Sequence, residues 1–484
     1  MKNVTRIVSL LLALAMVMAL GLTGCSSSPA APSNTPSATP GTDAPADDTP
    51  VAEGVTDDPS VKQLNLWSFT DEIPKMMTKF KEVNPDFGLE IKETIIATTD
   101  GAYQPALDAA LATGGADAPD IYAAEAAFVL KYAQGEGAQY AAAYKDLGID
   151  VDAKIKEADI AKYTIEIGTR PTDGAVVGLG YQATGGAYIY RRSIAQDVWG
   201  TDDPAVIKDK IGPGWDKFFA AAEELKAKGY GIVSGDGDLW HPVENSSEKG
   251  WIVDGKLYID PKREAFLDQS KMLKENGYHN DTQDWQDAWY ADMKDAGPKK
   301  IFGFFGPAWL INYVLAKNSG AEYDENGNFV KAGGTYGDWA VCEPPVGFFW
   351  GGTWVFANKD TKVPASAGKI IEWITLDSSD TGLQYFWANG TLNGPGGTKD
   401  TVASGTVMAK SDGKLDFLGG QNMFDVFVPA GQFASGKNLT PSDESINIIW
   451  RDQVRQYAAG QKSREQALAD FKSQVADTLA IPVE

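Results

Sequence analysis

Three tryptophans stand where an indole ring could meet a ligand. Trp350 and Trp354 bracket the pair Gly351–Gly352, so bulky aromatic side chains flank a backbone that glycine leaves open. Trp240 lies in the Gly- and Asp-rich stretch Ser234–Pro242, which reads as a loop. Flat rings of this kind stack on the apolar C–H faces of sugars. We therefore predict these three tryptophans as ligand-binding residues, with burial in a core as the alternative.

Polar side chains in two other stretches are candidate hydrogen-bond partners for a ligand. Asp71 and Glu72 follow an expected strand over residues 61–69, and α/β folds bind ligands beyond the carboxyl ends of their strands. Gln182 lies in the glycine-rich stretch 178–186, which bends easily and leaves polar groups open. We predict Asp71, Glu72 and Gln182 as ligand-binding residues.

Motifs for covalent, nucleotide or metal chemistry are weak or missing. Residues 178–183 fit the spacing of a dinucleotide-binding glycine motif, but a β-type run follows where a helix should begin. The sequence has no Walker loop, no nucleophile elbow and no zincin motif. His241 and His279 lie far apart and share no metal-ligand spacing with Cys342. We therefore predict no catalytic residue, no metal and no cofactor, although 66 acidic residues leave a glycosidase carboxylate pair open.

The order of the expected elements indicates an α/β fold. Residues 61–69 and 89–96 have strand patterns, and residues 73–83 between them have helical spacing. The stretch Trp285–Tyr290 carries aromatic residues at its first, fifth and sixth positions, which predicts the buried face of a helix.

The stretch Asp173–Arg192 organises the chain. Two apolar β-type runs, Ala175–Val177 and Ala187–Tyr190, flank a flexible segment rich in glycine. We interpret it as an extended connection from one lobe to another, with a binding cleft beside it.

The composition limits the partners of this chain. A formal net charge of -23 argues against nucleic acid, because neutralising phosphates requires clusters of Lys and Arg. It argues equally against an anionic ligand held by bulk charge, and its plainest role is solubility. A length of 484 residues suggests two or three domains.

The N-terminus predicts export and a lipid anchor. Lys2 and Arg6 precede an apolar run over 7–20, and Leu22-Thr23-Gly24-Cys25 is similar to the bacterial lipobox. We predict a signal peptide over 1–24, a lipid on Cys25, and a disordered Ser/Pro/Ala/Thr tether over 25–60. An ordinary signal peptide with a chance cysteine is the alternative.

Several motifs, taken in order, resemble one family. They are Asp173-Gly174 with Gly178-Leu179 and Tyr188–Arg192, the run Ala118–Tyr122, Pro307-Ala308-Trp309, and the stretch Gly347–Asn358. Together they resemble the family 1 extracellular solute-binding proteins, the maltose-binding-protein-like components of sugar importers. The sequence departs from the family pattern at Gly180, which replaces a proline, and at Ala308, which separates Pro307 from Trp309.

The resemblance implies a two-lobed periplasmic-binding-protein-like α/β fold with crossover hinge segments. It places lobe 1 at 61–178 and 353–428, and lobe 2 at 179–352 and 429–484. It also adds two candidate site residues. Trp309 would stack on a sugar ring, and Glu125, beyond a short strand, would accept from a hydroxyl or cap the next helix.

The implied function is capture rather than catalysis. We expect a monomeric receptor, anchored through Cys25 at the extracellular face of the bacterial membrane. It would close on an oligosaccharide and deliver it to the permease subunits of an ABC-type importer. The alternatives are a cell-surface glycoside hydrolase or lyase, and the same fold binding a non-sugar solute.

Overall fold

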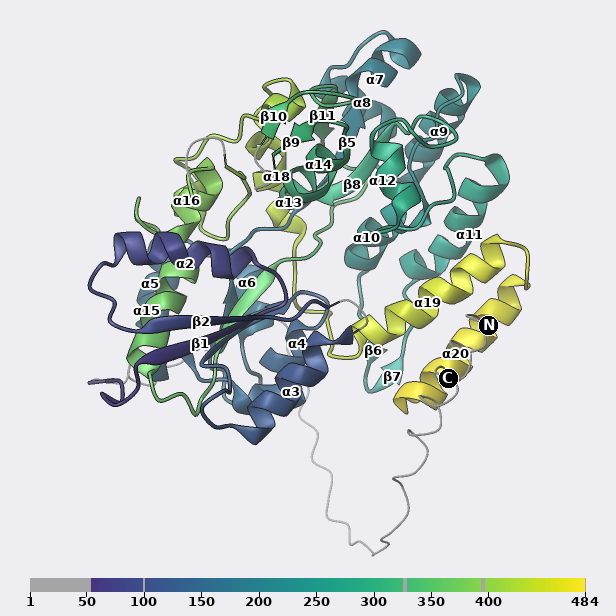
Figure 1. The fold of residues 1–484 in the computed structure, drawn as a ribbon. Helices are drawn as coiled ribbons and strands as arrows, with labels where there is room; N and C mark the ends of the chain where they lie inside the picture. The colour runs from purple at the N-terminus through teal and green to yellow at the C-terminus, as the bar shows by residue number, and fades with distance from the viewer. Residues whose placement is uncertain (1–53, 99–100, 325–328, 393–396, 484) are drawn as a thin grey trace, which may run out of the picture. The chain divides into compact units, whose positions relative to one another are not determined.

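One lobe is built on a five-stranded sheet. The computed structural model describes residues 54–98, 101–324, 329–392 and 397–483. In these residues the strands of the first sheet follow the order β2-β1-β3-β12-β4 (Figure 1). β1 runs parallel to β2 and β3, whereas β12 is antiparallel to β3 and β4. The strands are β1 (Gln63–Ser68), β2 (Glu90–Ile95), β3 (Ile121–Glu125), β4 (Gly178–Gly180) and β12 (Thr353–Ala357).

The predicted strand–helix–strand opening is confirmed. Helix α2 (Glu72–Val83) joins the parallel strands β1 and β2, and buries Ile73, Met77 and Phe80 at helical spacing. The loop between β1 and α2 therefore leaves the carboxyl end of the sheet. The other helices of this part are α3 (Tyr103–Thr113), α4 (Val129–Ala133), α5 (Val151–Ala158), α6 (Lys162–Gly168), α15 (Pro364–Thr375), α16 (Leu383–Asn389) and α17 (Gly405–Met408).

The second lobe contains a three-stranded antiparallel sheet in the order β11-β5-β8. Its strands β5 (Gly186–Arg191), β8 (Gly303–Pro307) and β11 (Trp339–Cys342) are buried throughout. The helices that follow along the chain are α7 (Arg192–Trp199), α8 (Pro204–Ile211), α9 (Trp215–Ala227), α10 (Asp236–Ser246), α11 (Pro261–Asn276), α12 (Asp287–Met293), α13 (Ala308–Leu310) and α14 (Ala316–Asn318), and the hairpin strands are β6 (Ile252–Val253), β7 (Lys256–Leu257), β9 (Glu322–Tyr323) and β10 (Phe329–Lys331).

Two extended segments run from one sheet to the other and pair with each other. The first links β4 to β5, and the second links β11 to β12. Gly186 N donates to Phe348 O at 2.9 Å, and Trp350 N donates to Thr184 O at 3.0 Å. A third segment joins them, because Ala183 N donates to Thr401 O at 3.1 Å. The central stretch is therefore the crossing that its sequence predicts.

The C-terminal helices pack on the second lobe. They are α18 (Phe424–Ala430), α19 (Asp443–Ala458) and α20 (Arg464–Leu479). α18 contacts β5, and α19 lies between α11 and α20 (Figure 1). The predicted lobe boundaries stay a prediction, but Gly178–Gly180 pairs with β12 of the first sheet and α18 already contacts the second.

The chain enters the first lobe through α15. The Asp57 carboxylate accepts hydrogen bonds from the backbone N–H groups of Ala365 and Ser366 at 2.9 and 3.1 Å. Residues 54–60, which were expected in the tether, therefore include Asp57, a residue that caps the N-terminus of α15. The predicted signal peptide, Cys25 and the rest of the tether lie outside the described residues. Among the helices that are described, none has both the length and the apolarity to span a bilayer.

Candidate ligand-binding cavity

A cavity of about 1210 Å³ collects side chains from both lobes, the crossing segments and α19. From the first lobe come the β1–α2 loop and the end of β3. From the second come α10, the residues before α12, and the turn from β8 into α13. The lining residues on which the site depends are Asp71, Glu72, Glu125, Gln182, His241, Glu244, Asp284, Trp285, Trp309, Tyr313, Trp350, Asp443, Glu444, Asn447, Arg451 and Arg455.

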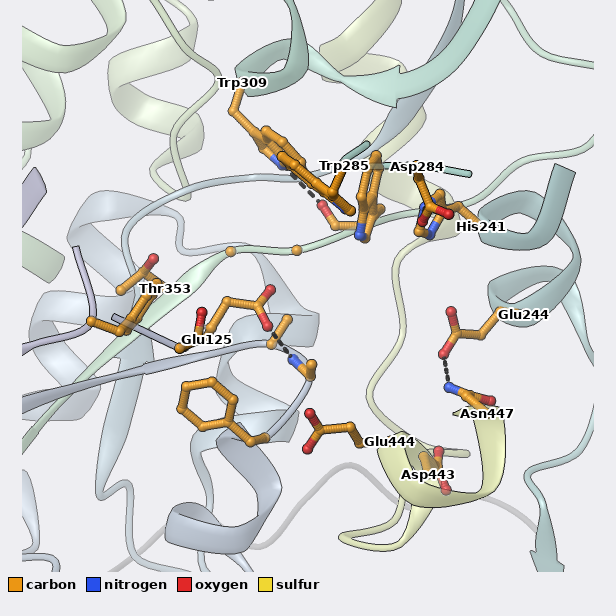
Figure 2. Close-up of a pocket in the computed structure, with 18 of the residues that line it drawn as sticks. Glu125, His241, Glu244, Asp284, Trp285, Trp309, Thr353, Asp443, Glu444 and Asn447 are labelled. Atoms are coloured by element: carbon orange, nitrogen blue, oxygen red, sulfur yellow. Dashed lines mark hydrogen bonds and ion pairs between the residues drawn. The ribbon is translucent and has the colours of Figure 1, made fainter. Parts of the chain in front are cut away.

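Aromatic rings form one wall of the cavity. Trp309 lies in α13, two residues beyond the end of β8, and donates its Nε1–H to the carbonyl of Trp350 at 3.1 Å. The two rings meet edge to face, with centroids 4.7 Å apart. Trp285 lies nearly parallel to Trp309, at 6.2 Å and 10° (Figure 2). These indoles offer the apolar faces on which sugar rings stack.

Trp285 is a cavity residue that the sequence pattern missed. Helix α12 begins only at Asp287, so Trp285 precedes it in a left-handed conformation with φ of 66°. Such a φ is an outlier for a bulky residue, and strain of this kind clusters at ligand sites. The side chain is 47% exposed, whereas Trp289 is buried as predicted. Tryptophan is not a residue type that indicates a positive φ. The helical spacing therefore led to the wrong prediction that Trp285 is buried.

Carboxylates form the opposite part of the lining. Glu125 ends β3 and accepts from Ala127 N at 2.8 Å. Glu244, near the end of α10, accepts from the Asn447 side chain of α19. Asp443 and Glu444 open α19. Figure 2 shows Glu125 and Glu244 on opposite sides of the hollow, Asp443 and Glu444 together at the start of α19, and Trp285 and Trp309 beyond one end.

These carboxyl groups hold their protons unusually tightly. Burial raises the pKa of Glu125 to about 7, and the neighbouring Glu444 and Glu244 add to it. Burial likewise raises the pKa of Glu244 to about 7, against the opposing pull of Arg263. The pKa of Asp443 rises to about 6, again mainly through burial.

Asp284 is the exception, because it has a cationic partner. Arg451 Nη2 lies 2.6 Å from its carboxylate, and Arg455 Nη2 lies 3.8 Å away. Burial acts to raise the pKa of Asp284, but Arg451 and then His241 outweigh it, so the pKa falls below its ordinary value. The ion pair ties α19 to the loop that carries Trp285.

His241 backs the aromatic wall. Its imidazole stacks on Trp350 at 3.5 Å and 15°. The residue is 7% exposed, and neither ring nitrogen has a hydrogen-bond partner among the described residues. Burial lowers the pKa of His241 to about 3, so the ring is neutral near pH 7.

A polar cluster lies where the crossing segments meet the cavity. Glu72 accepts hydrogen bonds from Tyr181 of the first crossing and from Tyr313 of the second lobe. Gln182 donates to the buried carboxylate of Asp400 at 3.1 Å. The Tyr313–Glu72 contact therefore joins the two lobes beside the cavity.

Most of the predicted site residues meet at this cavity. Its lining includes the predicted residues Trp309, Trp350, Trp240, Glu125, Gln182, Asp71 and Glu72. Asp71 is exposed and ion-paired to Lys75 at 2.5 Å. Contact with a ligand stays a prediction for each of them.

The prediction for Trp354 is wrong. It lies within β12, opposite Ala124 of β3 and Gly180 of β4, and these small neighbours leave room for its ring inside the sheet. The side chain is fully buried and donates its Nε1–H to Thr164 O at 3.1 Å. Alternating direction along the strand sends the side chain to the core, where its ring packs against the backbone of Gly352.

The predicted loop around Trp240 is a helix, α10. Asp238 accepts from the backbone N–H groups of Ser234 and Gly235, both at 3.0 Å, and so caps the helix start. Acidic residues in a first turn favour a helix. Trp240 borders the cavity, but it is 2% exposed and packs on Phe266. An exposed platform at this position is therefore wrong.

Comparisons with known proteins agree with this architecture. A model of the family described as bacterial extracellular solute-binding protein matches residues 75–412. A crystal structure of an extracellular solute-binding protein of family 1 has a TM-score of 0.66 at 19% identity, covering 86% of this chain and 99% of that one. No curated protein gives a significant match.

Two sugar-bound structures share the fold. The galacto-N-biose/lacto-N-biose I-binding protein of a Bifidobacterium longum ABC transporter, in complex with lacto-N-biose, has a TM-score of 0.63 at 17% identity, covering 88% of this chain and 100% of that one. An ABC transporter associated binding protein from B. animalis subsp. lactis, in complex with β-1,6-galactobiose, has a TM-score of 0.59 at 17% identity, with the same coverage of 88% and 100%. The predicted two-lobed periplasmic-binding-protein-like fold is confirmed.

Proposed function

This chain belongs to the bacterial extracellular solute-binding protein family, and from that premise we propose that it captures an oligosaccharide in the cavity between its lobes. The observation that carries the proposal is one cavity with indole faces on one side and carboxylates on the other. The indoles would stack on sugar C–H faces, and the carboxylates would accept from hydroxyls. The sugars bound in the two neighbouring structures support it.

Capture by closure fits the crossing segments. Two extended stretches run from one sheet to the other and a third pairs with them, so a few backbone angles would set how far the cavity opens. The Tyr313–Glu72 hydrogen bond would form as the lobes approach. The closed form would then present a surface to the permease of an ABC-type importer.

Anchoring is the second part of the proposal. We propose that the signal peptide is removed before Cys25 and that a lipid on Cys25 holds the protein at the outer face of the membrane. Replacing Cys25 by Ser should release the protein into the medium and abolish labelling with radioactive palmitate. Retention of the variant in the membrane fraction would contradict this part.

Sugar binding is tested by titration calorimetry. The purified mature protein is titrated with neutral di- and trisaccharides of differing linkage, and saturable binding of at least one is expected. Because several indoles line the cavity, their fluorescence should change with the same dissociation constant. A panel in which no saccharide binds or stabilises the fold would overturn the proposal.

A hydrolase is the second candidate, because raised carboxyl pKa values suit a general acid. Glu125 and Glu244 both have pKa values of about 7. Chromatography of the saccharides after long incubation separates the two functions. Intact saccharide supports a receptor, and loss of saccharide that stops in Glu125→Gln supports an enzyme.

A further inference from the structure

The cavity lining is strongly acidic. The described residues of the lining include seven carboxylate side chains and two guanidinium groups but no lysine. Arg451 pairs with Asp284, and Arg455 lies 3.6 Å from Asp236 and 3.8 Å from Asp284. Both guanidinium groups are therefore already paired, so the other carboxyl groups of the lining face neither of them in an ion pair when they ionise.

Five of these carboxylates have no ion pair among the described residues, and one of the five, Glu72, accepts hydrogen bonds from two tyrosines, which leaves four. Asp71 and Asp284 have ion pairs, but Glu125, Glu244, Asp443 and Glu444 have none within the described residues. Their hydrogen-bond donors are neutral: a backbone N–H for Glu125 and an amide for Glu244. Arg263 lies near Glu244, but it donates to the backbone carbonyls of Lys249 and Glu244. We call these four residues the unpaired acids.

Local structure explains two of them but not the other two. Asp443 and Glu444 stand in the first turn of α19, where the helix dipole favours negative charge. Glu244 stands in the last turn of α10, where the dipole disfavours it. Glu125 follows the end of a strand and is raised in pKa by burial and by Glu444, so its position costs stability rather than adding to it.

His241 supplies an independent indication of a ligand. It lines the same cavity, three residues before Glu244 on α10, and neither of its buried ring nitrogens has a hydrogen-bond partner among the described residues, although Nε2 lies 3.9 Å from an oxygen of Asp284. A buried polar atom without a partner is costly and calls for an explanation. A neutral imidazole has one lone pair to offer an N–H donor, and it brings no positive charge that would repel a cation.

The aromatic wall suits the same kind of ligand. Trp285 and Trp309 present nearly parallel faces, and Trp350 closes the angle between them. Indole faces attract ammonium groups as well as C–H groups. A ring that carries an amine would satisfy both walls at once.

We infer that the cavity takes a ligand with a protonated amine, held by Glu125 and Glu244 while an apolar face of the ligand rests on Trp309. An amino sugar within an oligosaccharide is the source that the proposed function favours, and this part rests on that function. A linear polyamine has the same ammonium chemistry without the sugar ring. The acidic lining of the cavity supports the amine, and the proposed function supports the sugar ring.

Matched ligands test the inference. The protein is titrated at pH 7.5, where carboxyl groups with pKa values of about 7 are mainly ionised, and at low salt with β-1,4-linked trisaccharides of glucosamine, of N-acetylglucosamine and of glucose, and with spermidine. The three saccharides share a backbone and differ at C2, where they carry an amine, an acetamide or a hydroxyl. We expect the amine form to bind at least about tenfold more tightly than the hydroxyl form. The preference should shrink as salt is added.

Variants locate the preference. Glu125→Gln and Glu244→Gln keep hydrogen-bonding capacity and remove charge, so each should weaken the amine ligand by about tenfold and the hydroxyl ligand by less than about threefold. Glu248→Gln removes a charge from an exposed side chain outside the cavity and serves as the control. It should leave both affinities unchanged.

Each outcome decides between the two claims. Equal binding of the amine and hydroxyl saccharides overturns the inference and leaves the receptor function intact. If spermidine binds and no saccharide does, the inference of an amine-bearing ligand stands and the inference of an amino sugar is overturned. If none of the four probes binds, the amine inference falls, and the wider neutral panel decides the receptor function separately.

Discussion

At the residue scale, the site depends on how each tryptophan leaves its backbone. Trp309 comes out of β8 and Trp285 comes out of a strained turn, and both face the cavity. Trp354 lies inside a strand and faces the core. The residue type alone predicted a tryptophan ring that faces the ligand. The direction of the side chain, however, depends on its position in the alternation of the strand and on the backbone φ, which a single sequence shows only in part.

Trp309→Ala should cost more than about 2 kcal/mol of binding free energy, because a stacked, centrally placed indole is a typical hot spot. Calorimetry with the tightest saccharide measures the loss. Trp309→Phe keeps a ring and should recover part of it. Unchanged affinity in the alanine variant would remove Trp309 from the site.

Trp354→Ala should act on stability instead of contact. The indole is fully buried and hydrogen-bonded to Thr164 O, so its removal should lower the free energy of unfolding by about 3–5 kcal/mol. Urea denaturation checks this value. A fully stable variant with weakened sugar binding would instead restore the ligand-binding role that its sequence context suggested.

At the element scale, regular segments were predictable and short, capped ones were not. The opening strand–helix–strand follows from periodicity, and its bounds agree closely with the sequence patterns. Helix α10 was missed because its glycines and aspartates are typical of loops. Its capping by Asp238 depends on where the side chain points, and composition does not give that.

A substitution in the glycine pair Gly351–Gly352 tests the role of the second segment that connects the lobes. Gly352 has a φ of 117°, and its carbonyl accepts from Ala126 N at 3.0 Å, next to Glu125. A Cβ there would lie 3.1 Å from the Trp354 ring. Gly352→Ala should therefore lower the free energy of unfolding by about 1–3 kcal/mol and weaken saccharide binding together.

Thermal melts and calorimetry on Gly352→Ala measure both effects. Gly255→Ala is a matched control, because Gly255 also has a positive φ of 76° but lies in the β6–β7 hairpin. It should lose stability while keeping its affinity for saccharide. Equal affinities in the two variants would show that the crossing tolerates the change.

At the scale of the whole molecule, buried carboxyl groups set the response to pH. Burial raises the pKa values of Glu125, Asp238, Glu244 and Asp400 to about 7, so the folded chain binds these protons more tightly than the unfolded chain does. The free energy of unfolding should therefore fall as pH rises from about 4.5 to 7. Asp284, whose pKa is lowered, acts in the opposite sense at more acidic pH.

Melting curves of the ligand-free protein between pH 5 and 8 test this sign, and the midpoint should be higher at pH 5.5 than at pH 7.5. In the double variant Glu125→Gln and Glu244→Gln the slope should shrink, because two of the titrating groups are gone. A midpoint that rises with pH across this range would contradict the assignment.

The attachment of Asp57 to helix α15 determines which lobe the N-terminal segment is joined to. Asp57 fastens the entering chain to α15, on the lobe of the five-stranded sheet. We therefore expect a force applied to the residues before Asp57 to act first on this lobe, before it reaches the segments that connect the two lobes. If the N-terminal segment is anchored as proposed, we expect tension on it to leave the closing of the lobes around a ligand unaffected.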